Sequence, residues 1–119
     1  MGGRTHRVAL STIDGDVVHL HFGRTERFHI VDLDDEDYRV VEARDVDPAC
    51  RDGSHMAGAF EAVWRVIDDC EAVVVGKIGG PASAFLIDKG VRVFESVGKV
   101  DEILGKIIED KLLDNEGQA

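Results

Sequence analysis

The sequence predicts a single α/β domain built on a five-stranded mixed sheet flanked by helices. Two observations predict this class. The first half of the chain holds strand-like segments joined by polar turns, and the second half alternates helical apolar stripes with short apolar strands. With 119 residues, 44% of them hydrophobic, the chain suits one domain over 1–119 with its core at about 7–112.

Three strands and a short extended segment are predicted in the first half. Residues 7–13 (RVALSTI) are β-branched and apolar and stop at a turn, and the extended segment follows at 17–22. Residues 27–33 (RFHIVDL) alternate between apolar and polar side chains. An acidic turn then leads to a hairpin partner at 38–46, so the strands form an antiparallel meander.

The period of the apolar residues changes after a loop at 47–54. Ser54 is placed to cap a helix over 55–70, along which apolar residues recur at spacings of three and four. These residues are Met56, Phe60, Val63, Ile67 and Cys70.

Two strand–helix units complete the chain. Residues 72–76 (AVVVG) are apolar throughout, as in a strand covered on both faces. A second helix opens at 79–81 (GGP) and closes at Gly90. A strand at 91–95 and an amphipathic helix over 100–112 follow.

In order, these elements give three antiparallel strands followed by two parallel βα units, with the first strand central. This is an α/β sandwich of ribonuclease H-like type. Ligands of open α/β sheets bind beyond the carboxyl ends of the parallel strands. The loops 14–26, 47–54 and 76–80 are expected to meet at that edge.

The three loops carry side chains that bind metals or anions. Two helix N-termini, near Ser54 and Gly80, are expected at the same edge, and each exposes unpaired N–H groups with a partial positive charge. Soft or borderline ligands beside anion-accepting backbone favour a metal–sulfur cluster over a simple organic molecule. The side chains expected there are His19, His21, Arg24, Cys50, Arg51, Ser54, His55 and Lys77.

Several of these residues also have an ordinary structural interpretation. Two histidines two positions apart, such as His19 and His21, are more often a solvated strand face than a ligand pair. His29 is expected to be a packed or surface residue of its strand, and Cys70 belongs to the apolar stripe of a helix. Cys50 lies in a polar loop and is the better ligand candidate of the two cysteines.

Composition argues against several classes of protein. The formal net charge of −10 opposes general nucleic-acid binding, and the acidic runs are expected to form a solvated surface. Two cysteines are too few for a disulfide framework. We find no stretch that could span a membrane and no signal peptide, and therefore expect a cytoplasmic protein. The oligomeric state stays open.

A series of motifs in order resembles one known family. The motifs are the strand VALST, His21-Phe22-Gly23, the strand FHIVD, the stretch ending in HMAG, the segment DCEAVVVGKIGG and the strand GVRVFES. From about Arg7 to Leu112 the chain resembles the dinitrogenase iron–molybdenum cofactor-binding family, which includes NifX, NafY and the C-terminal domain of NifB. The loop 50–53 (CRDG) looks like the equivalent loop of NifB.

The resemblance implies the same fold and a non-catalytic role, the carriage of an iron–sulfur or molybdenum–iron–sulfur cluster during cofactor assembly. Nitrogenase or other metallocofactor assembly proteins are the implied partners. By position, His21 is the implied cluster ligand, and residues 76–80 would line the same cavity. Our cofactor-binding candidates are His21, Phe22, Gly23, Arg24, Cys50, His55, Lys77, Gly79 and Gly80, with His21 and Cys50 as metal ligands.

Two other functions are weighed against this one. A ribonuclease H-like nuclease needs several carboxylates around two metal ions, yet the middle of the first strand, 9–11 (ALS), holds no acid. A non-metal regulatory or interaction module on the same fold would use the acidic surface or a sheet edge. That module predicts no metal after anaerobic purification and a stable complex with a partner.

Overall fold

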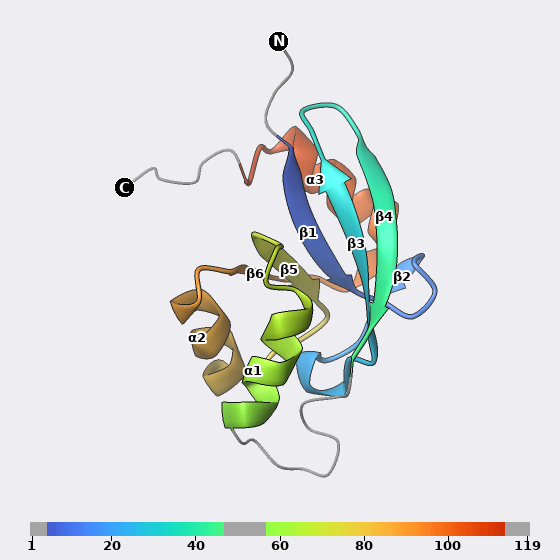
Figure 1. Ribbon diagram of the computed structural model, residues 1–119. Coiled ribbons are helices and arrows are strands. Elements are labelled where there is room, and N and C mark those ends of the chain that lie inside the picture. The colour runs from blue at the N-terminus through green and yellow to red at the C-terminus, as the bar shows by residue number, and fades with distance from the viewer. Residues whose placement is uncertain (1–4, 47–56, 114–119) are drawn as a thin grey trace.

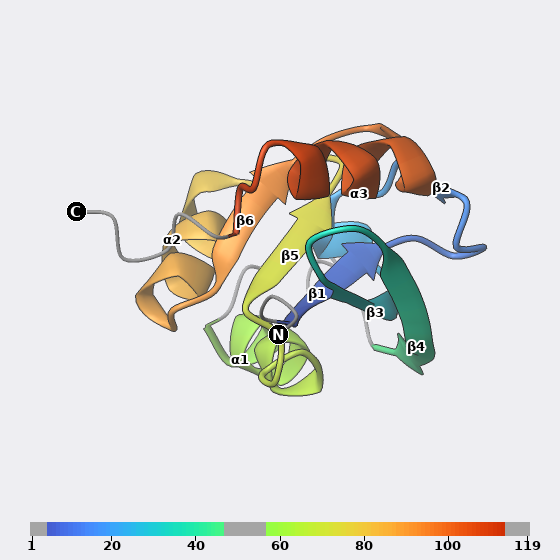
Figure 2. The same cartoon turned by 90° about the horizontal axis from the view of Figure 1, so that it is seen from above.

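The computed structural model describes residues 5–46 and 57–113, which form one five-stranded sheet with helices on both faces (Figures 1 and 2). The elements in chain order are β1 (His6–Ser11), β2 (Val17–Val18), η1 (Phe22–Arg24), β3 (Arg27–Leu33), β4 (Tyr38–Asp45), α1 (Ala57–Val66), β5 (Ala72–Val75), α2 (Gly80–Asp88), β6 (Arg92–Glu95), β7 (Gly98–Lys99) and α3 (Val100–Glu109).

The strand order β4-β3-β1-β5-β6 places β1 at the centre of the sheet, as predicted. Strand β3 pairs antiparallel with both β1 and β4, whereas β1, β5 and β6 are mutually parallel. The mixed sheet of three antiparallel strands and two parallel units is thus confirmed. Observed strand ends differ from the predicted 7–13 and 38–46 by one or two residues, the usual uncertainty of a pattern-based boundary.

The sheet separates two apolar cores because successive side chains of a strand point to opposite faces. Ala9 faces the core under α1 and α2, and its neighbours Val8 and Leu10 face the core under α3. Figure 2 shows α1 and α3 on opposite sides of the sheet. All four residues of β5 are buried, as its wholly apolar sequence predicts. None of the described helices is long and apolar enough to cross a membrane.

Helix α1 ends at Val66, four residues before the predicted end, and this corrects the boundary at Cys70. A tertiary contact is made at this end. Arg44 of β4 donates from Nη1 to the Val66 carbonyl (2.7 Å), so a guanidinium takes a carbonyl of the last helical turn. Ile67 and Cys70 still lie in the core, in tight turns. The predicted start at His55 and the Ser54 cap lie outside the described residues.

The other two helices end close to their predicted positions. Gly90 has φ +88°, and the Val91 N–H donates to the Leu86 carbonyl (2.9 Å), which closes α2 with the predicted glycine. Helix α3 ends at Glu109, before the predicted 112, because Lys111 turns into the left-handed region (φ +52°). Leu113 is nevertheless buried in the core under α3.

A second, two-stranded sheet was not predicted. Strand β2 pairs antiparallel with β7, Val17 opposite Lys99 and Val18 opposite Gly98. Each strand has only two residues, too few for a periodic pattern. The pairing ties the segment that follows β1 to the start of α3, where the Val100 N–H donates to the Asp16 carbonyl (2.8 Å).

Two arginines and two aspartates tie the end of α1 to the sheet. Arg44 forms a two-bond contact with the Asp69 carboxylate (2.7 and 3.0 Å), and Arg7 of β1 donates to the same carboxylate (3.0 Å). Arg7 also forms a two-bond contact with Asp32 of β3 (2.9 and 3.1 Å). The hydrogen bonds from Arg44, and to a smaller extent the bond from Arg7, hold the pKa of Asp69 well below its usual range.

Replacing Asp69 by asparagine should lower the free energy of unfolding at pH 7 by about 1 kcal/mol, a modest figure because the carboxylate is 40% exposed. Since the folded state has the lower pKa, this contribution is complete above the unfolded pKa of about 3.9 and is lost as the pH falls through the folded value. Urea unfolding at several pH values should therefore show the difference from wild type shrinking below about pH 4.

The neighbouring substitution Asp68→Asn is the matched control, since Asp68 is exposed and forms no ion pair with another described residue. It should change the unfolding free energy at pH 7 by less than about 0.5 kcal/mol. Equal losses from both substitutions at pH 7 would contradict a specific role for Asp69.

Candidate functional site

His21 stands exposed at the start of a tight turn whose next residue is buried. The Arg24 N–H donates to the His21 carbonyl (3.0 Å) and the Thr25 N–H to the Phe22 carbonyl (3.1 Å), which closes η1. Phe22 is 1% exposed, and its ring lies 6.4 Å from that of Phe60 of α1, centroid to centroid. The side chain of Phe22 therefore anchors the turn from within the core, while the imidazole stays on the surface.

Backbone hydrogen bonds join this turn to the segment that follows β5. The Phe22 N–H donates to the Lys77 carbonyl (2.7 Å), and the Gly76 N–H donates to the Leu20 carbonyl (2.8 Å). His21 and Lys77 face each other in a parallel bridge. The structure thus brings together two of the loops expected at this edge, 14–26 and 76–80.

The close pairing depends on the glycine at position 76. A Cβ atom there would lie 2.9 Å from the Leu20 carbonyl oxygen and 3.0 Å from the His19 carbonyl carbon. Both are backbone atoms, which cannot move aside as a flexible side chain would. Gly76 thus allows the chain before His21 to lie directly against the end of β5.

Two buried hydroxyls hold the same turn from the other side. Thr25 Oγ1 donates to the His21 carbonyl (3.0 Å) and lies 2.7 Å from Ser11 Oγ at the end of β1. Ser11 is fully buried and Thr25 is 1% exposed. The residue that carries the imidazole is therefore tied to the central strand as well as to β5.

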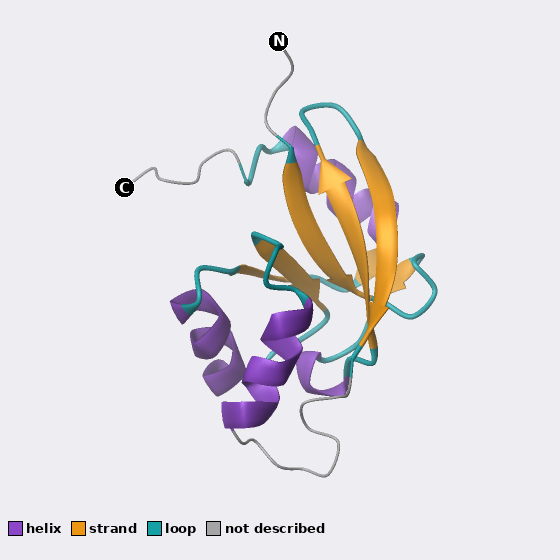
Figure 3. Ribbon diagram, in the orientation of Figure 1, coloured by secondary structure: helices purple, strands orange, loops and turns teal. Residues whose placement is uncertain are grey.

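The loop between β5 and α2 forms the other side of the site. The Ile78 N–H donates to the Glu95 carboxylate (2.8 Å), which fixes the loop against the end of β6. Gly79 is the N-cap of α2 and offers no side-chain cap, and Gly79 and Gly80 are both exposed. The helix thus begins at this edge with its partial positive charge uncapped by a side chain. Figures 1 and 3 show η1 and the first turns of α1 and α2 at the same end of the sheet.

Two cationic residues lie in the same two backbone segments as His21. Arg24 and Lys77 are exposed, and neither forms an ion pair with another residue in 5–46 or 57–113. Both remain available to an anionic ligand. The carboxylate of Glu95, at the end of β6, is engaged by the Ile78 N–H.

His19 and His29 lie in different surroundings from His21. His19 is exposed, with Nδ1 3.4 Å from the Val17 carbonyl oxygen. His29 lies in β3, where Nε2 donates to the Ile13 carbonyl (3.3 Å) and the ring packs over Gly15. His29 is thus a packed strand residue, as the sequence suggested.

Of the two cysteines, Cys70 lies within the described residues. Cys70 is 4% exposed in the core under α1, and burial raises the pKa of its thiol to about 12, so it stays protonated and inert. Cys50 lies outside the described residues, as do Arg51, Ser54 and His55. Among residues 5–46 and 57–113 no three His, Cys, Asp or Glu side chains gather as a metal-ion site. Within that part of the chain, His21 therefore belongs to no such group.

An imidazole in the same segments as cationic residues suits a particular kind of ligand. A lone divalent ion needs three or four protein ligands. A metal–sulfur cluster already has its bridging sulfides and needs a protein ligand only at an open metal position, while its negative charge is attracted by Arg24, Lys77 and the helix start. Taken over residues 5–46 and 57–113 alone, the donor set at this edge thus fits a preformed anionic cluster better than a free ion.

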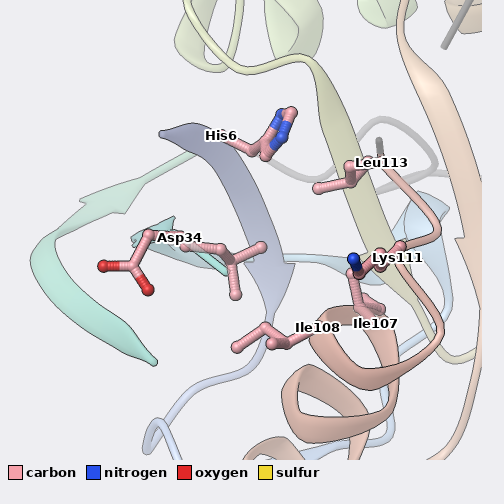
Figure 4. A pocket seen from close by; sticks show the side chains of 7 residues that line it. His6, Asp34, Ile107, Ile108, Lys111 and Leu113 are labelled. Carbon is pink, nitrogen blue, oxygen red and sulfur yellow. The ribbon is translucent and has the colours of Figure 1, made fainter. Parts of the chain in front are cut away.

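A hollow at the opposite edge of the sheet does not compete with this site. It lies among His6, Leu33, Asp34 and the end of α3, and its volume of about 10 Å³ suits one water molecule (Figure 4). His6 is buried beside it and pairs through Nδ1 with the Glu71 carboxylate (2.8 Å).

Three residues that shape the site were missed by sequence reasoning: Ser11, Thr25 and Glu95. Ser11 carried a weak signal, since it is a hydroxyl in an otherwise apolar strand. Gly76 was predicted at this edge as part of the loop 76–80, without its contact to the segment before His21. Thr25 and Glu95 carried none, because their contacts join segments that are distant in the chain or in different elements.

The fold and the site define an α/β protein with an exposed histidine and two exposed cationic residues in loops at the carboxyl edge of a mixed sheet. Residues 4–110 match the model of the family described as dinitrogenase iron-molybdenum cofactor, and the chain belongs to this family. The resemblance noted in the sequence is thereby confirmed.

Relatives with assigned names agree with this membership. The chain is 40% identical over 73 residues to the FeMo cofactor biosynthesis protein NifB of Herbaspirillum seropedicae, covering 61% of the chain and 14% of that protein. It is 33% identical over 104 residues to NifB of Frankia alni, covering 84% and 20%. Protein NifY of Klebsiella pneumoniae is 34% identical over 79 residues, covering 66% and 33%. The chain thus spans a fifth or less of these NifB relatives.

Solved structures share the fold over nearly the whole chain. The crystal structure of PH0822 superposes with a TM-score of 0.69 at 26% identity, covering 87% of this chain and 89% of that one. A crystal structure of the Methanocaldococcus jannaschii protein mj0327 gives a TM-score of 0.59 at 16% identity, covering 91% and 92%, and bears on the fold alone.

Proposed function

We propose that this chain is a small non-catalytic carrier or chaperone of an iron–sulfur or molybdenum–iron–sulfur cluster, or its precursor, during metallocofactor assembly. One observation carries the proposal: an exposed imidazole, His21, is held by backbone hydrogen bonds beside Lys77 at the carboxyl edge of the sheet. The family description and the names of the NifB relatives, which refer to the FeMo cofactor, support it.

Each residue of the site has a separate role in binding the cluster. His21 supplies a ligand to an open metal position of the cargo. Arg24, Lys77 and the start of α2 offset the negative charge of the cluster. The glycines among the candidates, Gly23, Gly79 and Gly80, let the backbone approach a bulky ligand.

Further ligands and associations belong to the same proposal. Cys50 or His55 supplies a second ligand. Nitrogenase or other metallocofactor assembly proteins, in the cytoplasm, donate and receive the cluster. The strand order, in which only β3 runs against the other four strands, supports a ribonuclease H-like classification.

The test is anaerobic reconstitution with iron and sulfide, with and without molybdate, followed by absorption spectroscopy and metal analysis. Wild type should develop a charge-transfer chromophore that gel filtration does not remove. His21→Ala should lower the affinity for the cluster by about tenfold or more, because it removes a ligand. Its stability should stay within about 0.5 kcal/mol of wild type, because His21 is exposed.

His19→Ala is the matched control, since His19 is an exposed histidine two residues away that does not face Lys77. It should bind the cluster like wild type. A chromophore insensitive to His21→Ala would contradict the assigned ligand. Wild type that takes up no metal but forms a stable protein complex would replace the carrier by the interaction module.

A further inference from the structure

We propose that Thr25 is the positioning residue of the His21 site: its buried hydroxyl, itself fixed by Ser11, sets the direction in which the imidazole is presented to the cargo. The inference rests on the proposed function for the identity of the cargo. Its structural basis is the hydrogen-bond chain Ser11–Thr25–His21.

The donor and the acceptor in each of these hydrogen bonds follow from the number of protons that a hydroxyl can donate. A threonine hydroxyl has one proton to donate. Thr25 Oγ1 gives that proton to the His21 carbonyl (3.0 Å), which has none to give in return. Ser11 Oγ, 2.7 Å away, must then donate to Thr25. Both hydroxyls are buried, so water does not compete for either bond.

The Ser11–Thr25–His21 hydrogen bonds act on the peptide plane that follows His21. The His21 carbonyl accepts from Thr25 Oγ1 and from the Arg24 N–H, and the N–H of the same plane, that of Phe22, donates to the Lys77 carbonyl. With both ends of the plane fixed, ψ of His21 is held at 146°. The direction of the Cα–Cβ bond relative to Lys77 is fixed with it.

Thr25 is the side-chain contribution to this arrangement. The other bonds on the plane are made by backbone groups, which every residue type except proline would provide. Replacing Thr25 by valine keeps the shape but leaves the Ser11 hydroxyl without its acceptor and the His21 carbonyl without its side-chain donor. Thr25→Ser keeps the hydroxyl and loses only a methyl group.

The experiment compares anaerobic uptake of a cluster formed from iron and sulfide by wild type, T25V and T25S. Loss of a hydrogen bond that orients a metal ligand typically weakens metal binding by about tenfold or more. T25V should therefore bind about tenfold more weakly, with an altered electron paramagnetic resonance spectrum of the bound cluster, while T25S binds like wild type.

Thr12→Val provides a matched control for the loss of a buried hydroxyl at the same end of β1. Thr12 is fully buried, and its Oγ1 accepts from the Gly15 N–H (3.1 Å) and bonds Asp14, not the His21 turn. T12V should retain wild-type affinity. Wild-type affinity in T25V, or an equal loss in T12V and T25V, would overturn the proposal.

A ligand-free measurement separates this proposal from the proposed function. If wild type takes up no cluster, the carrier function fails, and NMR then decides the positioning. T25V should show faster amide exchange at Arg24 and changed backbone shifts at His21, with T25S and T12V unchanged there. Unchanged exchange and shifts in T25V would refute the positioning role regardless of any cargo.

Discussion

Replacement of Phe22 by alanine should lower the free energy of unfolding by about 3 to 5 kcal/mol, a large share of the 5 to 15 kcal/mol typical of a domain. Phe22 is 1% exposed and packs in the core under α1, with Phe28 and Ile30 of β3 in the same cluster. Alanine would leave a cavity that rigid strands and a helix cannot fill. The same change removes the anchor of the turn that presents His21.

Urea unfolding followed by the fluorescence of Trp64, the single tryptophan, measures this loss. Ile87→Ala is a suitable control because the side chain of Ile87 is 59% exposed, so the loss should stay within about 0.5 kcal/mol. Phe22→Leu should cost less than about 1.5 kcal/mol, since it refills most of the volume. A Phe22→Ala protein as stable as Ile87→Ala would mean that the turn is not anchored in the core.

The order and direction of the main strands follow from the sequence because burial imposes a pattern on it. The apolar run at 72–76 predicts a covered strand, and the alternation at 27–33 predicts a strand between two different surroundings. Short connections and the βα order then leave few arrangements of the sheet. The central place of β1 is therefore predictable without any contact being known.

Features set by tertiary contacts could not be predicted in this way. The end of α1 is bonded by Arg44, a residue of another element, which donates to the Val66 carbonyl. Strands β2 and β7 are two residues long and pair across most of the chain. Neither a single distant guanidinium nor a two-residue strand leaves a periodic signal in its own segment.

The candidate site likewise has one part that the sequence pattern predicts and one part that depends on tertiary contacts. Topology predicts that the loop holding His21 and the loop holding Lys77 meet, and their backbones are hydrogen-bonded. The side-chain hydrogen bonds that fix the His21 carbonyl are not predictable from pattern, since the hydroxyls of Ser11 and Thr25 act through one specific geometry. The roles assigned to Cys50 and His55 remain predictions.

Replacing Gly76 by alanine should separate the His21 turn from β5 and lower the free energy of unfolding by about 1 to 3 kcal/mol. The added Cβ would lie 2.9 Å from the Leu20 carbonyl oxygen, the acceptor of the Gly76 N–H bond. Relief of this clash requires backbone movement, which weakens the neighbouring bond between Phe22 and Lys77. Cluster uptake should therefore fall along with stability, although no ligand side chain is changed.

Amide hydrogen exchange at Phe22 and Gly76 tests the mechanism, because both N–H groups are protected only while the two segments stay paired. Gly105→Ala is the control: Gly105 lies in α3 with open space around its Cβ position, so alanine should be neutral or stabilise by about 0.5 to 1 kcal/mol. Should Gly76→Ala keep wild-type protection at both amides, the close approach before His21 would not be what orders the site. Loss of protection confined to these segments, together with loss of uptake, would show that the backbone at position 76 sets the presentation of the imidazole.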